Sequence, residues 1–367
     1  MNTPGSTGSP RFGSGKSGSA ISGAPSRTYS KTASKLNIKK YAFLAKNIFK
    51  ANLGRLSQPY KLTFALTSKC NYRCQICNIW QKPPQNELSA AEIKRLFKKA
   101  PGFSWIDLTG GEIFLRKDFL DIVEIILATC PQLLLLHFPT NGYLTETIVS
   151  AVRKIAQWKP EKLILTISMD GDELMNDQIR GIPGGWRHQI ETFKRLREVP
   201  GVWTVLGMTV SALNAGQFER AFQAAKKEYP PLKYDDFHIN IAHISPHYYG
   251  KTDTDLISGS EKAMAETVQN YLKVRTFALD PVSFLEKQYL KRVGQYLQTK
   301  KTPIRCQALS SSCFLDATGA VYPCSMYDRC LGNIREWDYD LLALWNSEAA
   351  RRLQGEIWEF NCPQNAV

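Results

Sequence analysis

The chain has 367 residues, of which 43% are hydrophobic, and this length and composition are typical of a globular protein with a sizeable core. Its apolar runs are too short to span a bilayer and its N-terminus lacks the apolar segment of a signal peptide, so neither membrane insertion nor secretion is indicated. The net charge of +14 would suggest nucleic-acid binding, but residues 1–61 carry eleven Lys or Arg and no Asp or Glu, against 36 basic and 33 acidic residues in the remainder. The charge therefore belongs to the N-terminal arm, and we expect no specific nucleic-acid partner.

The N-terminal arm has two parts. Residues 1–35 are rich in Gly, Ser, Thr and Pro, a composition that cannot bury enough apolar surface to offset the entropy of ordering, so a disordered tail is expected. Residues 36–60 are expected to form a basic amphipathic helix, because lysines surround Tyr41 and Leu44 at helical spacing. This helix either packs on the following domain with its lysines in solvent, or contacts an anionic membrane surface peripherally through residues 36–53.

Residues 61–250 alternate short β-rich segments with helical ones, which is the pattern of βα units around a parallel sheet. The expected strands are Leu62–Thr67, Trp105–Thr109, Leu133–Phe138, Lys162–Met169, Trp203–Val210 and Asp236–Ala242. The expected helices are Ala90–Lys99, Asp118–Ala128, Glu146–Trp158, Trp186–Arg197 and Phe218–Tyr229. Polar residues share one face of several strands, as Thr166 and Ser168 do opposite Leu165 and Ile167, whereas a doubly wound sheet is apolar on both faces. We therefore predict an α/β fold with a partial (β/α)6 barrel and a polar lumen.

The alternation fades after residue 250. Residues 251–302 are expected to form a helical connector, and residues 303–367 a separate cysteine-bearing module. Turn-forming residues from Asp316 to Gly319 separate two β-prone segments, so we predict a hairpin that brings Cys324 back toward Cys306.

Three cysteines, Cys70, Cys74 and Cys77, directly follow the first expected strand. Thiolates are the ligands that iron–sulfur clusters require, and a cubane cluster with three protein ligands keeps one iron open for a substrate or cofactor. A zinc site and a redox pair of Cys74 and Cys77 are the competing interpretations. The redox pair needs only two sulfurs, and no second CxxC lies nearby to complete a zinc site.

Small and polar residues also follow the later strands, at the end where parallel α/β folds place functional groups. They are Gly110, Gly111 and Glu112 after the second strand, Asn141 after the third, Ser168 and Asp170 at the fourth, and Asn214 after the fifth. The glycines allow a ligand to approach the backbone, and Glu112 offers an acceptor for an ammonium group. Arg180 offers a planar fork for a carboxylate. An ammonium and a carboxylate on one ligand describe an amino acid.

In combination, these motifs resemble the radical S-adenosylmethionine (radical SAM) enzymes. The family signature is CxxxCxΦC followed by a GGE-type motif on the next strand, and Cys70, Cys74, Cys77 and the segment Thr109–Glu112 match it. The resemblance covers about residues 60–245. It implies a partial barrel with a 4Fe-4S cluster on the three cysteines, which binds SAM and, when reduced, splits it to methionine and a hydrogen-abstracting 5′-deoxyadenosyl radical.

The resemblance also implies roles for the residues at the strand ends. Glu112 would hold the SAM ammonium, Ser168 and Arg180 its ribose and carboxylate region, and Asn214 part of the same pocket, with Gly110, Gly111 and Asn141 also in the cofactor site. Two positions depart from the family pattern, because Φ is Ile76 and the residue after GGE is Ile113 instead of proline. Neither departure removes a ligand.

The C-terminal module resembles the SPASM or the shorter twitch extension of radical SAM enzymes, which hold auxiliary iron–sulfur clusters. Cys306, Gly319 and Cys324 fit the spacing CX12GX4C, but only Cys362 follows where a full SPASM module needs a further run of cysteines. The module is therefore either twitch-like with one auxiliary 4Fe-4S cluster, or a fragment. Its ligands are expected to be Cys306, Cys324 and Cys362, with Cys330 or Cys313 as the fourth. A structural zinc site is the alternative.

We expect a cytoplasmic radical SAM enzyme that modifies a peptide or natural-product precursor and receives electrons from a flavodoxin- or ferredoxin-type reductant. His238 and Asp170 are the candidate catalytic residues, because both lie on the lumen face of their strands, whereas His137 is interpreted as a core residue of an apolar strand. A twitch-type radical dehydrogenase of an alcohol or sugar is one alternative. A non-catalytic iron–sulfur or zinc-binding protein is the alternative from another class.

Overall fold

A computed structural model describes residues 37–83, 85–251, 255–276, 281–299 and 304–360, so the predicted tail and Cys362 lie outside the described residues. All its strands belong to one sheet in the order β6-β5-β4-β3-β2-β1-β7-β8-β9. The strands are β1 (Lys61–Thr67), β2 (Trp105–Gly110), β3 (Leu135–Thr140), β4 (Lys162–Ser168), β5 (Val202–Val210), β6 (Phe237–Ile241), β7 (Ser312–Leu315), β8 (Ala320–Tyr322) and β9 (Gly332–Asn333). Strands β1 to β6 run parallel and pair in chain order, so the predicted six-stranded partial barrel is confirmed.

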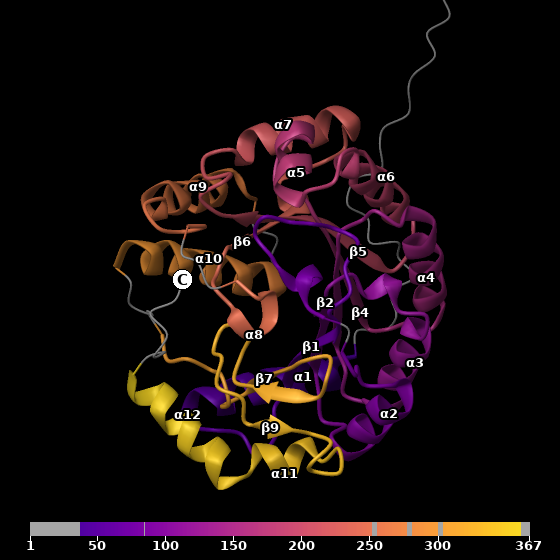
Figure 1. The fold of residues 1–367 in the computed structure, drawn as a ribbon, viewed down its shortest axis with the longest axis vertical. Helices are drawn as coiled ribbons and strands as arrows, with labels where there is room; N and C mark the ends of the chain where they lie inside the picture. Colours follow the sequence, from indigo (N-terminus) through magenta and orange to yellow (C-terminus); the bar gives the residue numbers. More distant parts are fainter. Residues whose placement is uncertain (1–36, 84, 252–254, 277–280, 300–303, 361–367) are drawn as a thin grey trace, which may run out of the picture.

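Helices connect the parallel strands and form an arc around the outside of the curved sheet (Figure 1). The helices are α1 (Ile38–Leu53), α2 (Ala90–Lys99), α3 (Phe119–Thr129), α4 (Thr145–Gln157), α5 (Glu173–Arg180), α6 (Gly185–Arg197), α7 (Phe218–Glu228), α8 (Pro246–Tyr249), α9 (Glu261–Val274), α10 (Pro281–Thr299), α11 (Leu341–Trp345) and α12 (Glu348–Phe360). Short 3-10 turns occur at Ile79–Gln81, Ile113–Leu115 and Tyr234–Asp236. The bounds of α2 match the prediction because Ser89 and Glu92 form a capping box at its start.

The two faces of the sheet differ in chemistry, as the sequence predicts. Leu62, Phe64 and Leu66 of β1 lie on the outer face and belong to the core that the surrounding helices cover. Alternate residues therefore point to the inner, concave face, which we call the lumen. A second small apolar cluster lies on this inner side, where Ala65 of β1 and Phe314 of β7 pack against Tyr248 of α8.

The C-terminal cysteine region continues the barrel sheet. β7 pairs in parallel with β1, with Cys313 beside Leu62, and β7 and β8 form the predicted hairpin across the Asp316–Gly319 turn. Pairing with β7 satisfies the edge of β1, which would otherwise offer unpaired backbone groups. Local patterns could not predict this join, because the two strands lie far apart in the chain.

Helix α1 packs on the domain but keeps apolar side chains in solvent. Lys40 Nζ donates to Leu133 O at 2.9 Å, and Asn37 N to Glu161 Oε1 at 3.4 Å. Phe49 and Leu53 are 66% and 71% exposed. No helix among the described residues is long and apolar enough to cross a membrane. The packing interpretation of this helix has direct support, and its contact with a membrane surface stays a prediction.

Phe314 should be essential to the join between barrel and hairpin. Its side chain is fully buried and contacts the rings of Tyr248 and Tyr322. Phe314→Ala should lower the free energy of unfolding by about 3–5 kcal/mol, because it leaves a cavity on the inner side of the sheet. Anaerobic urea denaturation measures this, with Phe49→Ala as the exposed control, expected within about 0.5 kcal/mol of the parent. Equal effects of the two substitutions would contradict the packing described.

Candidate functional site

The cysteine loop after β1 is held by the end of helix α5. Arg73 N donates to Arg180 O at 3.3 Å, and Gln75 N to Ile179 O at 2.8 Å. Gly181 adopts a positive φ of 66° directly after α5, and a Cβ there would lie 2.4 Å from Arg73 O. The last carbonyl groups of α5 therefore find partners in the cysteine loop, which fixes the loop against the fourth βα unit.

Gly110 and Gly111 allow the end of β2 to contact the cysteine loop directly. A Cβ on Gly110 would lie 2.3 Å from Thr67 O, and one on Gly111 would lie 2.1 Å from Lys69 O. Gly111 N donates to Thr67 O at 2.7 Å in the same contact. The sequence suggested that these glycines make room for a ligand. In the structure, glycine is required at both positions because the backbone of the cysteine loop lies so close.

Glu112 is a buried carboxylate with several donors. Its oxygens accept hydrogen bonds from Thr140 Oγ1 at 3.0 Å, from Asn141 N at 2.8 Å and from Phe114 N at 3.3 Å. Burial nevertheless raises the pKa of Glu112 to about 7, because it outweighs the stabilising hydrogen bonds and the positive charge of Arg180. A positively charged group beside Glu112 would favour its ionised form.

Asn141 connects the end of β3 to the cysteine loop. Its Nδ2 donates to Asn71 Oδ1 at 2.7 Å and lies 3.9 Å from Cys70 Sγ, while its backbone N–H serves Glu112. An amide donor aimed at a cysteine sulfur stabilises a thiolate. Glu112, Asn141 and Cys70 are thus brought together, as the sequence led us to expect.

Arg180 and Asp170 form a buried ion pair beside this group. Arg180 Nη2 lies 2.7 Å from Asp170 Oδ2, and the side chains are 8% and 0% exposed. Asp170 Oδ1 also accepts from Thr209 N at 2.8 Å. Asp170 therefore orients Arg180, and its catalytic role stays a prediction. Arg180 Nε is shielded from solvent and has no acceptor among the described residues, so it keeps a donor for a bound anion or carbonyl.

The sequence also assigned Asn214 and Ser168 to the cofactor site, and their surroundings differ. Asn214 Oδ1 accepts from Ser211 N at 2.8 Å, and its Nδ2 donates to Asp170 O at 2.9 Å and Thr209 O at 3.0 Å. The Asn214 amide thus supports the loop that carries Asp170, and its polar atoms already have partners. Ser168 ends β4 in a half-buried position.

The three thiols of the loop suit a multinuclear cluster. Burial raises the pKa of Cys70, that of Cys74 to about 11 and that of Cys77 to about 12, so thiolates at neutral pH require positive charge beside them, which iron supplies. Within the described ranges, no three His, Cys, Asp or Glu side chains converge on one point for a single ion. Each thiolate of a cubane cluster binds a different iron, so cluster ligands need not converge in that way.

Helix α8 lies inside the curve of the sheet, next to the cysteine loop (Figure 1). Tyr248 Oη is 2.7 Å from Thr109 Oγ1 and accepts from Gly110 N at 3.2 Å, and Cys70 and Cys77 pack against its cluster. Sequence reasoning missed this helix. The only local signal was Ser245-Pro246, where Ser245 caps the helix and proline occupies its first turn.

A second set of cysteines flanks the β7–β8 hairpin, with Cys306 before β7 and Cys324 and Cys330 after β8. Cys324 Sγ accepts hydrogen bonds from Met326 N at 3.4 Å and Tyr327 N at 3.3 Å, an environment that favours a thiolate ligand. Cys306 is half-buried and Cys330 is exposed. Cys313 is 2% exposed within the core, so it is not available as the fourth ligand, and Cys130 is likewise a core residue.

The two lumen histidines have well-defined partners. His238 Nδ1 lies 2.6 Å from Glu286 Oε1 of α10, and Glu286 also pairs with Arg275. Although burial opposes ionisation, hydrogen bonds and charge from His238 and Arg275 lower the pKa of Glu286 to about 2. His137 contacts Asp107 and Thr166, so both ring nitrogens have partners, as expected of a satisfied core histidine, but the side chain faces the lumen and not the apolar outer core. The alternation of Ile106, Asp107 and Leu108 was the available signal for Asp107.

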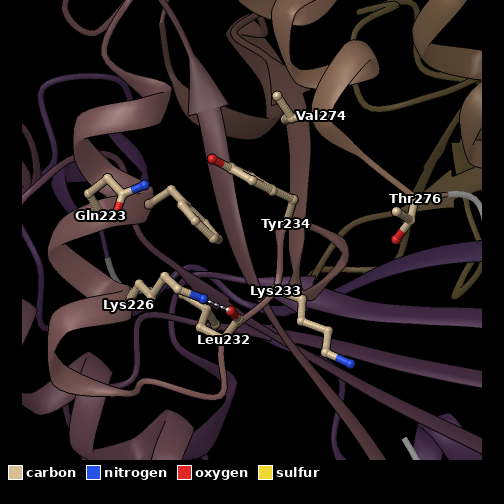
Figure 2. Close-up of a pocket in the computed structure, with 8 residues that line it drawn as sticks. Gln223, Lys226, Leu232, Lys233, Tyr234, Val274 and Thr276 are labelled. Atoms are coloured by element: carbon tan, nitrogen blue, oxygen red, sulfur yellow. Dashed lines mark hydrogen bonds between the residues drawn. The ribbon is translucent and has the colours of Figure 1, made fainter.

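None of these cysteine, glycine or histidine residues lines the surface hollow of about 330 Å³ shown in Figure 2. It is lined by α7, by the segment before β6 and by Val274 and Thr276 at the end of α9. Phe222 and Tyr234 stack within it at a centroid distance of 3.8 Å, and Lys226 Nζ already donates to Leu232 O. It contains none of the cysteine, glycine or lumen motifs and is not part of the candidate site.

Comparisons with known proteins agree with this geometry. Residues 64–225 match the radical SAM superfamily, and residues 306–365 match the SPASM iron–sulfur cluster-binding domain. The fold resembles the structure of Streptococcus suis SuiB bound to S-adenosylmethionine, with a TM-score of 0.56 at 16% identity over 88% of this chain and 70% of that one. It resembles anSMEcpe with bound AdoMet equally, with a TM-score of 0.56 at 16% identity over 80% of this chain and 83% of that one. Residues 64–225 therefore form a radical SAM domain and residues 306–365 a SPASM-type domain, and these domains imply a 4Fe-4S cluster, SAM and auxiliary iron–sulfur clusters.

Curated relatives include two maturation proteins of Bacillus subtilis. The chain is 24% identical to the antilisterial bacteriocin subtilosin biosynthesis protein AlbA over 83% of this chain, and 29% identical to the sporulation killing factor maturation protein SkfB over 43%. It is also 36% identical to a GTP 3′,8-cyclase of Vibrio parahaemolyticus over 33% of its length. These matches span 63%, 38% and 37% of the respective relatives, so the chain covers less than two thirds of each.

The raised pKa of Glu112 predicts a pH-dependent stability in the absence of SAM. Folding raises this pKa from 4.5 to about 7. The folded state therefore binds the proton more tightly, and stability falls as the pH rises from 4.5 to 7, by up to about 3 kcal/mol. Relative to Glu112→Gln, the unfolding free energy of the parent should decrease between pH 5 and pH 8 in anaerobic urea titrations. A difference between the two proteins that does not change with pH would contradict the assignment.

Proposed function

We propose that this chain is a radical SAM enzyme that abstracts hydrogen from a peptide substrate. The observation that carries the proposal is the convergence of the cysteine loop with Glu112, Asn141 and Arg180 at one end of the barrel. When bound, a reduced 4Fe-4S cluster with SAM supplies a 5′-deoxyadenosyl radical. The lumen below this end of the barrel would then receive the substrate.

Each residue of the site would have a distinct task. Cys70, Cys74 and Cys77 would hold the cluster, and the Asn141 amide would stabilise the Cys70 thiolate. Glu112 would accept hydrogen bonds from the SAM ammonium, whose positive charge favours the ionised carboxylate. Arg180, held by Asp170, would use its unpartnered Nε–H toward SAM. Gly110 and Gly111 would act indirectly by allowing the strand to pack on the loop, and Ser168 would face the ribose.

Several facts support a peptide as the substrate. Two relatives are named for the maturation or biosynthesis of a killing factor and a bacteriocin, and the SuiB fold has also been solved bound to the precursor peptide SuiA. The anSMEcpe fold has been solved with the Cp18Cys peptide. Cys306 precedes β7, and Cys324 and Cys330 follow β8, in the part of the sheet that extends β1. These three cysteines, together with Cys362, would hold an auxiliary cluster. A flavodoxin- or ferredoxin-type reductant in the cytoplasm would suit a cluster that requires reduced thiols.

Incubation of the reconstituted chain with SAM, dithionite and synthetic peptides encoded beside its gene tests the proposed function. We expect 5′-deoxyadenosine together with a peptide product that has lost hydrogen, detected by mass spectrometry. GTP, alcohols and sugars are assayed in parallel. Turnover of one of these small molecules, with every peptide unchanged, would replace the peptide assignment, and a complete lack of 5′-deoxyadenosine with intact cluster absorbance would refute the enzyme.

Cys74→Ala should abolish SAM cleavage and remove about four iron atoms per chain, because a three-ligand site does not retain its cluster with two thiolates. Iron analysis and chromatography of 5′-deoxyadenosine measure both effects. Cys130→Ala is the matched control, since Cys130 is a buried core thiol outside both cysteine sets. Full turnover by the Cys74 variant would refute the ligand assignment.

The double variant Cys306→Ala/Cys324→Ala should lose an auxiliary cluster, and with it about four iron atoms per chain, while SAM cleavage continues. The first set follows β1, whereas Cys306 and Cys324 flank the β7–β8 hairpin, so loss of one set should leave the other intact. Unchanged iron and sulfide in the double variant would show that the second set holds no cluster.

A further inference from the structure

A hydrogen-bonded chain of three side chains crosses the lumen between β2, β3 and β4. His137 Nδ1 lies 3.1 Å from Asp107 Oδ1, and His137 Nε2 lies 2.9 Å from Thr166 Oγ1. The residues that alternate with them, such as Leu136 and Leu165, belong to the outer core, so the three polar side chains face the lumen. The arrangement of carboxylate, imidazole and hydroxyl matches the geometry of an oriented general base.

The Asp107 carboxylate is held in its ionised form. Lys61 Nζ lies 3.2 Å from Asp107 Oδ2, and Trp105 Nε1 donates to Oδ1 at 2.7 Å. Burial by itself would raise the pKa of Asp107, but Lys61 and His137 outweigh it and hold the pKa well below its usual range. An ionised carboxylate can only accept, so the neutral His137 ring must donate its Nδ1–H. Nε2 is then free to accept the hydrogen of the Thr166 hydroxyl, whose lone pairs remain available to a donor in the lumen.

The chain of side chains lies close to the cysteine end of the barrel. Thr109, the next lumen-facing residue of β2 after Asp107, contacts Tyr248 beside the cysteine loop. Two residues of a strand span about 6.6 Å, so Asp107 is one layer below that contact. The His137 side chain is 26% exposed and that of Asp107 14%, which leaves the imidazole accessible. None of these three residues has a task in the proposed SAM site.

We propose that His137, oriented by Asp107 and reached through the Thr166 hydroxyl, is the proton acceptor for the substrate. This inference rests on the proposed function, which supplies a substrate carbon radical. When that radical carbon adjoins an N–H or O–H group, loss of one electron and of that proton forms a double bond between the two atoms. The electron passes to an oxidised iron–sulfur cluster. The proton passes to Thr166 Oγ1 as the threonine proton moves to His137 Nε2, and Asp107 stabilises the resulting imidazolium.

Separate measurement of SAM cleavage and product tests the proposal in the reconstituted full chain. For His137→Gln and Asp107→Asn, 5′-deoxyadenosine should still form, while peptide product per 5′-deoxyadenosine falls about 100-fold, the usual contribution of a general base. Thr166→Val should reduce the same ratio. His188→Gln, which alters an exposed histidine of α6, is the matched control. An unchanged ratio in His137→Gln would overturn the proton acceptor, whereas no 5′-deoxyadenosine in the parent would instead refute the proposed function.

Two readouts separate proton transfer from a structural role. Imidazole should restore product formation to His137→Ala but not to Asp107→Asn. Histidine ¹⁵N NMR of the parent, with its clusters oxidised, needs neither a substrate nor a variant. It should show His137 protonated at Nδ1 with Nε2 accepting a hydrogen bond. A neutral His137 that carries its proton at Nε2 would overturn the proposed proton transfer through Thr166. Failure of imidazole to rescue a folded His137→Ala variant would overturn it as well.

Discussion

The contact between the end of β2 and the cysteine loop is the constraint on which the rest of the site depends. Side chains at Gly110 or Gly111 would clash with the backbone oxygens of Thr67 or Lys69. Because this contact is so close, Glu112 follows in a buried position where the end of β3 can donate to it, and Asn141 of the same segment reaches the cysteine loop. One steric requirement thus couples β1, β2 and β3.

The sheet itself places the two cysteine sets in one rigid frame. β1 carries the first set at its end and pairs with β7, whose hairpin carries Cys324 shortly after β8. The inner apolar cluster of Ala65, Tyr248 and Phe314 contacts Cys70 and Cys77 of the first set and Tyr322 of β8. A protein that generates a radical at one cluster and moves an electron to another requires fixed separation, and hydrogen-bonded strands provide it more reliably than a linker.

Local patterns predicted much of this architecture, and their failures have physical causes. The capping box of Ser89 and Glu92 fixed the bounds of α2 from neighbouring residues alone. Helix α5 was missed although Asp172 caps its start and Gly181 ends it, because it is only two turns long and lacks an apolar run. The sequence suggested Arg180 as a ligand for a carboxylate and Asp170 as a catalytic residue. Both side chains are buried, and they pair with each other because an unpaired buried charge is costly.

The sequence by itself determined the class of chemistry, because the cysteine spacing and the GGE motif are short-range features. It also determined the parallel barrel, because the hydrophobic period and the turn residues repeat along the chain. Only the tertiary structure decided which polar residues meet. It joined β7 to β1, took Cys313 into the core and set His137 between Asp107 and Thr166. Strand register and sheet curvature bring distant residues together, and no local pattern encodes which side chain lies opposite another across three strands. The cysteine loop could therefore be predicted from the sequence, whereas the hydrogen-bonded set of Asp107, His137 and Thr166 in the lumen could not.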